Sequence, residues 1–298
     1  MTVQTHRSPE GGPLAGSIRA ALAAAVLGAL LAGCGASIMP QIHNEADRLT
    51  VARRLYDKGE NAIVVEVLSN YTQTGSGNAD IDQAVYLLGN AYLKQRDFTS
   101  AQTQFERIAR DYPESDSATA AAFRLGEALF GQSRDADFDQ EFTLKAIGQW
   151  RRVLEDAPGS DWAALADQRI AACRTRLAQK LWRNGDIYVK QNLYEPALIY
   201  YRSVINDYSD TPVLGDALIG MAVADARLGR KDTALVVLRD LETRFSGRAL
   251  GLRAAAVRSK VERWPAAGDT KHLRHRSVEA SQPVPQSVTP STTTPFGP

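Results

Sequence analysis

Between residues 82 and 113 the hydrophobic positions recur with the period of an α-helix. The apolar and small residues form two stripes, first Val85, Leu88, Gly89 and Tyr92, then Ala101, Phe105 and Ile108, and Pro113 follows. Residues three, four and seven positions apart lie on one face of a helix. The pattern therefore predicts two helices joined by a short turn, which is a helical hairpin.

The spacing of this hairpin resembles that of the tetratricopeptide repeat, in which each position has a packing role. Gly89 and Ala101 have little or no side chain, so the two helices can approach closely. Tyr92 and Phe105 are large enough to fill the space toward the next hairpin. A single hairpin cannot bury both of its faces, so it requires neighbours of the same kind.

The same register returns along the chain. A weaker hairpin is predicted over 45–71, a third over 117–158, a fourth over 181–204 and a fifth over 211–245, followed by a closing helix over 247–264. The third hairpin contains an eight-residue insertion within SRDADFDQEFT, and an additional helix precedes the fourth. We expect an all-α, right-handed superhelix of about five helical hairpins over residues 45–264.

The insertion has alternating acidic residues, Asp135, Asp137, Asp139 and Glu141. Such alternation invites comparison with a calcium loop, but the glycine and the terminal glutamate of that loop are missing. The sequence favours a solvated loop at the tip of the hairpin, and it indicates no metal site.

The N-terminal residues have the pattern of a secretory signal. Residues 20–32 are small and apolar, a run too short to span a bilayer permanently. The following Leu31-Ala32-Gly33-Cys34 resembles the bacterial lipobox, which implies that residues 1–33 are removed and that Cys34 carries a lipid. A signal with an incidental cysteine is the alternative. Residues 34–44 are then expected to form a tether. Lipoproteins retained in the inner membrane of many bacteria carry aspartate after the lipidated cysteine, whereas this chain has Gly35. The resemblance therefore implies that the protein is anchored in the outer membrane and faces the periplasm.

Composition excludes several functions. The formal net charge is +1, without the basic excess of a nucleic-acid binder. The four histidines, His6, His43, His272 and His275, all lie outside 45–264, so that region is a poor candidate for an enzyme. Cys173 is expected to be a buried structural thiol. No cofactor is indicated, and the tail at 265–298, rich in proline, serine and threonine, is expected to be disordered.

In a stack of such hairpins the first helices line a concave groove that suits an extended peptide, because rings supply contact area and polar groups bond the backbone. The repeat register places these positions in the groove: Gln83, Tyr86, Asn90, Lys94, Phe123, Glu127, Trp182, Asp186 and Lys190. For Phe123, packing between hairpins is an equally good explanation, and for Trp182 a less good one.

Several motifs resemble the BamD (YfiO-like) lipoproteins. They are Tyr112-Pro113-Glu114-Ser115, Asp156 to Ala163 (DAPGSDWA), Arg174-x-Arg176-Leu177-Ala178, and Tyr208-Ser209-Asp210-Thr211-Pro212. The resemblance covers roughly 45–245, whereas the basic C-terminal tail and the longer Gly-rich loop at 73–78 depart from it. It implies a lipid-anchored periplasmic scaffold of the outer-membrane β-barrel assembly machinery. Its N-terminal hairpins would bind unfolded outer-membrane proteins. Its C-terminal hairpins would bind the barrel insertase, alongside other assembly-complex lipoproteins.

Two alternatives stay open. Another envelope repeat lipoprotein, such as a secretin pilotin or a Tol-Pal or cell-division accessory scaffold, would share the lipobox and the hairpins. An envelope hydrolase would need a pair of carboxylates in one cleft. Glu127 and Asp186 are the candidates, but they belong to different hairpins, so the sequence predicts that the chain is not an enzyme.

Overall fold

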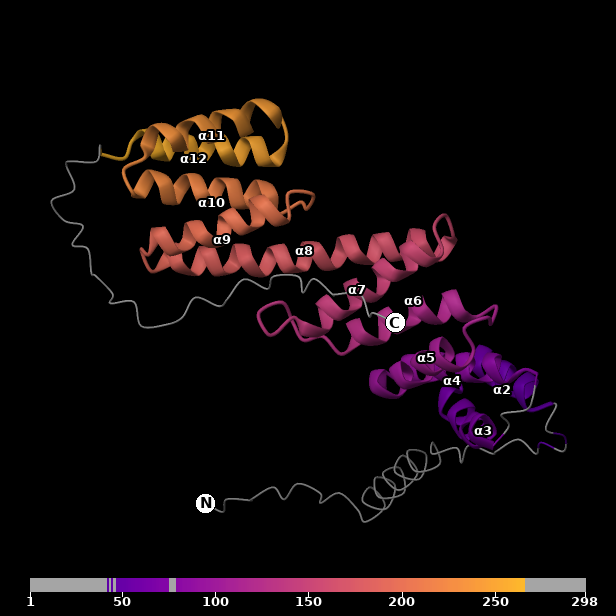
Figure 1. Cartoon of the computed structure of the whole chain (residues 1–298). Helices are drawn as coiled ribbons and strands as arrows, with labels where there is room; N and C mark the ends of the chain where they lie inside the picture. The colour runs from indigo at the N-terminus through magenta and orange to yellow at the C-terminus, as the bar shows by residue number, and fades with distance from the viewer. Residues whose placement is uncertain (1–41, 43, 45–46, 75–78, 266–298) are drawn as a thin grey trace, which may run out of the picture. The chain divides into compact units, whose positions relative to one another are not determined.

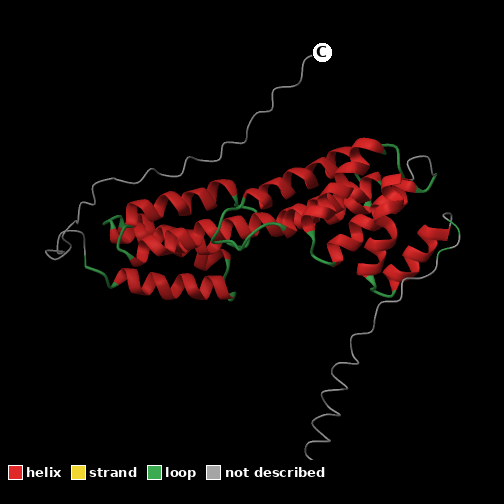
Figure 2. Cartoon of the chain, turned by 90° about the horizontal axis from the view of Figure 1, so that it is seen from below, coloured by secondary structure: helices red, strands yellow, loops and turns green. Residues whose placement is uncertain are grey.

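The computed structural model describes residues 42, 44, 47–74 and 79–265. The predicted signal peptide, Cys34, most of the tether and the tail from residue 266 lie outside the described residues. Within the described ranges all regular structure is helical, with loops and turns between the helices and no strand (Figure 2). The prediction of an all-α chain is confirmed.

The described residues form eleven α-helices, most of them 14 residues long (Figure 1). Their bounds are α2 Arg48–Asp57, α3 Asn61–Thr74, α4 Ile81–Lys94, α5 Phe98–Asp111, α6 Ala118–Gly131, α7 Glu141–Asp156, α8 Asp161–Lys190, α9 Tyr194–Asp207, α10 Leu214–Arg227, α11 Lys231–Arg244 and α12 Ala249–Glu262. From α2 to α7 and from α9 to α12, helices consecutive in the chain pack against each other, as expected of stacked hairpins. The additional helix and the first helix of the fourth hairpin are one continuous helix, α8, of 30 residues.

The described chain forms two compact units, whose boundary falls inside α8. The first unit extends to Ser133 and includes Gln140–Arg169; the second contains Arg134–Asp139 and the chain from Ile170. In the first unit each of α2 to α6 packs against the next helix, α7 being the last. In the second unit the same holds for α9 to α12, and α10 also contacts α12.

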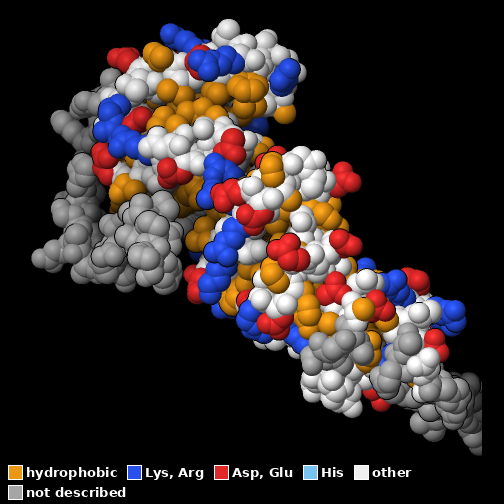
Figure 3. All heavy atoms as spheres, turned by 45° about the vertical axis from the view of Figure 1, so that its right-hand side comes forward, with side chains coloured by type: hydrophobic (Ala, Val, Ile, Leu, Met, Phe, Trp, Pro, Cys, Tyr) orange, Lys and Arg blue, Asp and Glu red, His pale blue; other side chains and the backbone are white. Residues whose placement is uncertain are grey.

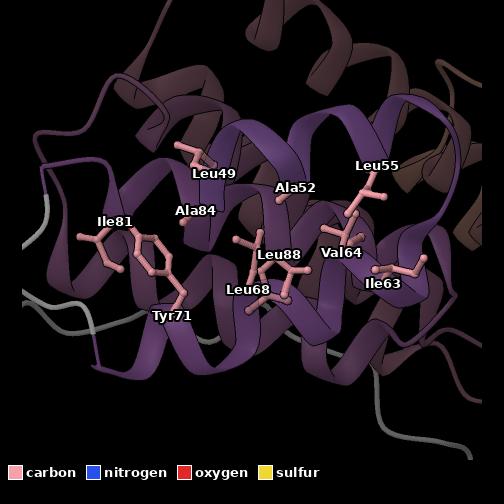
Figure 4. Close-up of a cluster of buried hydrophobic side chains, with 12 residues drawn as sticks. Leu49, Ala52, Leu55, Ile63, Val64, Leu68, Tyr71, Ile81, Ala84 and Leu88 are labelled. Carbon is pink, nitrogen blue, oxygen red and sulfur yellow. The ribbon is translucent and has the colours of Figure 1, made fainter. Parts of the chain in front are cut away.

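The N-terminal core of the first unit is built from the inner faces of α2, α3 and α4. Ala52, Leu68 and Leu88 lie at its centre, and Tyr71 lies beside Ile81 at one end (Figure 4). Ala52 and Leu68 have no exposed surface, and Leu88 is 2% exposed. Burying a leucine side chain such as Leu68 or Leu88 stabilises the fold by about 1.5–3 kcal/mol, so this cluster holds the weakly patterned first hairpin in place.

Four of the hairpin turns share one backbone feature. The residue two positions before the second helix has a positive φ, at Gly59 (80°), Arg96 (62°), Asn192 (60°) and Gly229 (87°). This left-handed conformation is easy for glycine and tolerable for asparagine, but it strains an arginine. The repeated geometry explains why these turns are short, and the exception is the α6–α7 hairpin with its insertion.

The insertion is exposed but not free. Its residues 134–139 belong to the second unit, where three basic side chains on one face of α8 hold them. Arg176 donates to the carbonyl of Arg134, Lys180 donates to the carbonyl of Phe138, and Arg183 Nη1 lies 3.1 Å from Asp137 Oδ1. The loop is exposed to solvent, as expected, and its backbone is in addition hydrogen-bonded to side chains of α8. Among the described residues no group of three or more metal-ligating side chains occurs.

Two further expectations concern single features. Cys173 lies in α8 and is 2% exposed, as expected of a structural thiol. Within the ranges that the structure covers, no helix combines the length and the apolar character needed to cross a bilayer.

Candidate functional site

The first unit contains a hollow of about 280 Å³ on the side formed by α4 and α6. Residues from the end of α2 and the start of α5 complete it. The lining combines aromatic, aliphatic, amide and charged side chains: Tyr56, Asn90, Leu93, Lys94, Phe98, Arg124 and Glu127. This mixture suits a peptide, because rings and Leu93 offer apolar area beside donors and acceptors for a backbone or a polar side chain.

The α4 side of the hollow is fixed by Asn90. This residue is 8% exposed, and its Nδ2 donates to the carbonyl oxygen of Tyr86 at 2.8 Å. A buried amide with a bonded donor keeps one orientation, since a broken bond would leave a polar group unpaired. Lys94, one turn further along α4, is exposed at the rim.

The α6 side is an ion-pair network centred on Glu127. Arg124 donates from Nη1 to Oε2 of Glu127, and Arg169, near the start of α8, donates from Nη2 to Oε1 at 2.8 Å. The Glu127 side chain is 19% exposed, against 34% for Arg124 and 55% for Arg169. Each carboxylate oxygen therefore has its own guanidinium.

Arg124 lies among aromatic rings. Its guanidinium carbon is 5.9 Å from the ring centre of Phe123 and 5.7 Å from that of Trp162. Burial lowers the pKa of Arg124, but the hydrogen bonds and charge of Glu127, with a contribution from Tyr86, outweigh it and raise the pKa above its ordinary value. Burial raises the pKa of the Tyr56 hydroxyl, partly offset by the charge of Arg124. The hollow thus holds a permanent cation and a neutral phenol at physiological pH.

The structure brings three of the predicted groove residues together in this hollow: Asn90, Lys94 and Glu127. Gln83 and Tyr86 lie on the same helix α4. The amide oxygen of Gln83 accepts a hydrogen bond from Arg53, and the half-buried ring of Tyr86 lies 6.1 Å from that of Phe105.

Phe123 is not a groove residue. Its side chain is 2% exposed, and its ring packs 6.2 Å from the ring of Trp150 and 5.2 Å from that of Trp162. Packing between hairpins, the alternative that the sequence left open, is what the structure shows. The reason is the bulk of the two tryptophans, which close over this position.

Trp182, Asp186 and Lys190 lie on α8 in the second unit. Trp182 is half-buried and packs against the cluster that contains Ala178 and Tyr201. Asp186 and Lys190 form an ion pair along the helix, with 2.7 Å between Oδ2 and Nζ. Such an exposed i, i+4 pair contributes only about 0.3–0.5 kcal/mol, so both groups remain available to a ligand.

Sequence reasoning missed Tyr56, Phe98 and Arg124. Arg124 lies one position from the predicted Phe123, and a long side chain reaches a surface that its Cα does not face. Its spacing of three residues from Glu127 was the available signal, because i, i+3 charges on a helix pair. Tyr56 belongs to the weakly patterned first hairpin, which gave no register from which to count.

Charged side chains of both signs are interspersed on the face drawn in Figure 3, with hydrophobic side chains between them. No large area of one sign dominates that face. The charge of the hollow is therefore a local property that the net charge of +1 does not reveal.

The family model described as "YfiO: Outer membrane lipoprotein" matches residues 50–237. The chain belongs to the YfiO family of outer membrane lipoproteins. This family consists of non-catalytic assembly factors, which agrees with the prediction that the chain is not an enzyme. The prediction that the chain is an outer-membrane lipoprotein and its resemblance to the BamD (YfiO-like) family are confirmed.

Curated relatives of this YfiO-family chain carry the name outer membrane protein assembly factor BamD. The protein of Caulobacter vibrioides is 24% identical over 51% of this chain and 50% of its own length. The Neisseria meningitidis protein is 24% identical over 52% of this chain and 62% of its own length. The Vibrio cholerae protein is 23% identical over 68% of this chain and 89% of its own length. The matches thus span about half to three-fifths of the first two relatives.

A solved tetratricopeptide repeat protein of Thermus thermophilus aligns with 72% of this YfiO-family chain and 98% of its own, with 16% identity and a TM-score of 0.33. The repeat fold of the present chain is evident from its own helix order, its hairpin turns and the close helix contacts at its glycines.

Proposed function

We propose that this chain is a lipid-anchored scaffold of the outer-membrane β-barrel assembly machinery that faces the periplasm. Its first unit binds extended segments of unfolded outer-membrane proteins in the hollow between α4 and α6. Its second unit binds the barrel insertase. The observation that carries the proposal is the hollow itself, which places rings, an oriented amide and charges side by side in a member of the YfiO family.

The chemistry of the hollow suits an unfolded barrel protein. Strands of a membrane barrel alternate apolar and polar side chains, so an extended segment offers both kinds within two residues. Tyr56 and Phe98 provide apolar contact for one side chain, while Asn90 and Lys94 provide hydrogen bonds for the next. Binding an unfolded segment requires no covalent step, which is consistent with a family of non-catalytic assembly factors.

Photo-crosslinking in cells tests the binding role. A photoreactive residue at Lys94, on the rim of the hollow, is expected to capture unassembled outer-membrane barrel proteins, and one at the exposed Arg152 of α7 is expected to capture far less. Depletion of the chain should lower the levels of assembled barrels several-fold. Unchanged barrel levels after depletion would contradict the proposal, and capture of a secretin would favour a pilotin.

Lipid attachment at Cys34 is the second part of the proposal. Cys34→Ser is expected to abolish incorporation of labelled fatty acid and to release the protein from the membrane fraction, because one thiol holds the anchor. Cys173→Ala removes the other cysteine of the chain and is the matched control, which should keep full labelling. Labelling that persists in Cys34→Ser would place the anchor elsewhere.

A further inference from the structure

The charges around the hollow do not balance. Lys94 and Arg124 line it beside one carboxylate, Glu127, and Arg169 adjoins it through Glu127, while Asp57 acts on the lining residue Tyr56 from outside. Both oxygens of Glu127 are already bonded, one to each arginine. The seven lining residues thus carry an excess of one positive charge, with Arg169 beside them, in a chain of 298 residues whose formal net charge is +1. The excess therefore distinguishes this site from the surface as a whole.

The arginines also have donors to spare. A guanidinium carries five N–H groups; Glu127 accepts one from Arg124 and one from Arg169, and Tyr86 also interacts with Arg124. Arg124 Nε is buried and has no acceptor within the described part of the chain. That buried atom is out of a ligand's reach, but the side chains of Arg124 and Arg169 are 34% and 55% exposed, so a ligand that supplies acceptor oxygens can bond their accessible N–H groups.

We propose that the hollow selects peptides carrying an acidic side chain, and that Glu127 is the resident counter-ion which this side chain replaces on Arg124 and Arg169. The inference rests on the proposed function, since it names the chemistry of the bound segment. Replacing one carboxylate by another keeps both guanidiniums paired. Glu127 thus competes with the ligand and sets a moderate affinity, and the rings of Tyr56 and Phe98 accept the neighbouring apolar residue.

The geometry favours a side chain over a chain terminus. The hollow lies at the C-terminal end of α4, where Lys94 is the last residue, and polar groups continue from it along α4 toward Gln83 near the start of the helix. A peptide segment whose side chain enters the hollow beside Arg124 can therefore continue along α4 toward Gln83. Charge complementarity and this continuity identify the occupant as the interior of an extended acidic segment.

The test uses the full lipidated chain in detergent and three fluorescent octapeptides with identical aromatic residues. One has aspartate at a central position and an amidated end, one has asparagine there and an amidated end, and one has asparagine and a free C-terminus. Fluorescence anisotropy at low and high salt gives the dissociation constants. The aspartate peptide is expected to bind about 3–10-fold more tightly than the amidated asparagine peptide, and salt should reduce that preference.

Glu127→Gln is the decisive variant, because it keeps the side-chain shape and removes the competing charge. It is expected to tighten binding of the aspartate peptide about tenfold and to leave the dissociation constant of the amidated asparagine peptide unchanged. Glu155→Gln removes the same charge from an exposed position of α7 in the same unit and should change neither. Arg169→Gln, a change at a half-exposed side chain, should abolish the preference for aspartate even if Glu127→Gln proves unstable.

Other outcomes overturn the inference in different ways. If Glu127→Gln weakens binding of the aspartate peptide or leaves its dissociation constant unchanged, Glu127 is not a competing counter-ion. If only the peptide with a free C-terminus gains affinity, the hollow recognises a terminus instead of a side chain. If no peptide binds to any form of the chain, the proposed function fails together with its refinement. If all peptides bind equally, the peptide-binding function survives and the acidic selectivity is wrong.

Discussion

Replacing Gly126 by leucine is expected to lower the free energy of unfolding of the first unit by about 3 kcal/mol or more. A Cβ atom at this position would overlap Nε1 of Trp150 and lie 2.6 Å from its Cδ1. Trp150 has no exposed surface, and its Nε1 donates to the carbonyl of Phe123 at 3.1 Å. The ring cannot retreat without breaking that bond, so the extra carbons must force α6 and α7 apart.

Gly148→Leu is the matched control for this prediction. Gly148 lies on α7, is exposed, and a Cβ there would meet no atom within 4 Å. Leucine favours a helix over glycine by about 0.8 kcal/mol, so the control should be neutral or slightly stabilising. Urea denaturation followed by circular dichroism and tryptophan fluorescence measures both variants. Equal stabilities for the two would show that α6 and α7 do not depend on close contact at Gly126.

The sequence predicted that helices approach closely at the repeat glycines, but it assigned the large rings to the space toward the next hairpin and not to the glycine of their own hairpin. Sixteen residues separate Gly89 from Phe105 and Gly185 from Tyr201, and in each pair a glycine Cβ would lie within 2.7 Å of the ring. The insertion widens the separation to 24 residues for Gly126 and Trp150, yet the same contact forms. A register read from small and aromatic positions therefore survives an insertion, because the contact depends on helix packing and not on the length of the loop.

The site was less predictable than the fold. Helix periodicity identifies which positions face the concave side. It does not show how far a long side chain extends toward a neighbouring surface, or whether a ring from another helix covers a position. Arg124 enters the hollow from beside the predicted face, and Phe123 leaves it because Trp150 and Trp162 cover its ring. Both outcomes depend on side chains from other helices, which one helix's pattern does not contain.

The division into two units was also beyond the sequence. The boundary falls inside α8, where the helical pattern runs from Asp161 to Lys190 without a proline. Linkers are recognised by a change in composition, and a continuous helix provides none. Likewise, the sequence predicted an exposed acidic loop but not the hydrogen bonds that hold its backbone, because their donors, such as Arg176 and Lys180, come from a helix far along the chain.

In the second unit, Tyr201→Ala is expected to cost about 3–5 kcal/mol of the free energy of unfolding. The ring is 2% exposed and lies against the backbone of two helices at their glycines. A Cβ atom built at Gly185 of α8 would lie 2.6 Å from the ring, and a Cβ atom built at Gly220 of α10 would lie 2.5 Å from it. No side chain at either glycine could expand into the space that alanine leaves. Denaturant titration of the variant should show the loss, and a change below about 1 kcal/mol would mean that the helices collapse onto the cavity.

Tyr201→Phe keeps the ring and isolates the hydroxyl. Burial, with the charge of Asp186, raises the pKa of Tyr201 well above its ordinary value of 10.0. The hydroxyl is therefore neutral in both states below about pH 10 and contributes no pH dependence there. Above that pH the unfolded chain releases the proton while the folded chain retains it, so stability falls by about 1.4 kcal/mol per pH unit until the folded pKa is reached. Because phenylalanine does not ionise, the variant should lose less stability than the wild type between about pH 10 and 11.5. An equal alkaline loss in both proteins would show that Tyr201 ionises without unfolding and that its ring is not sealed between the two glycines.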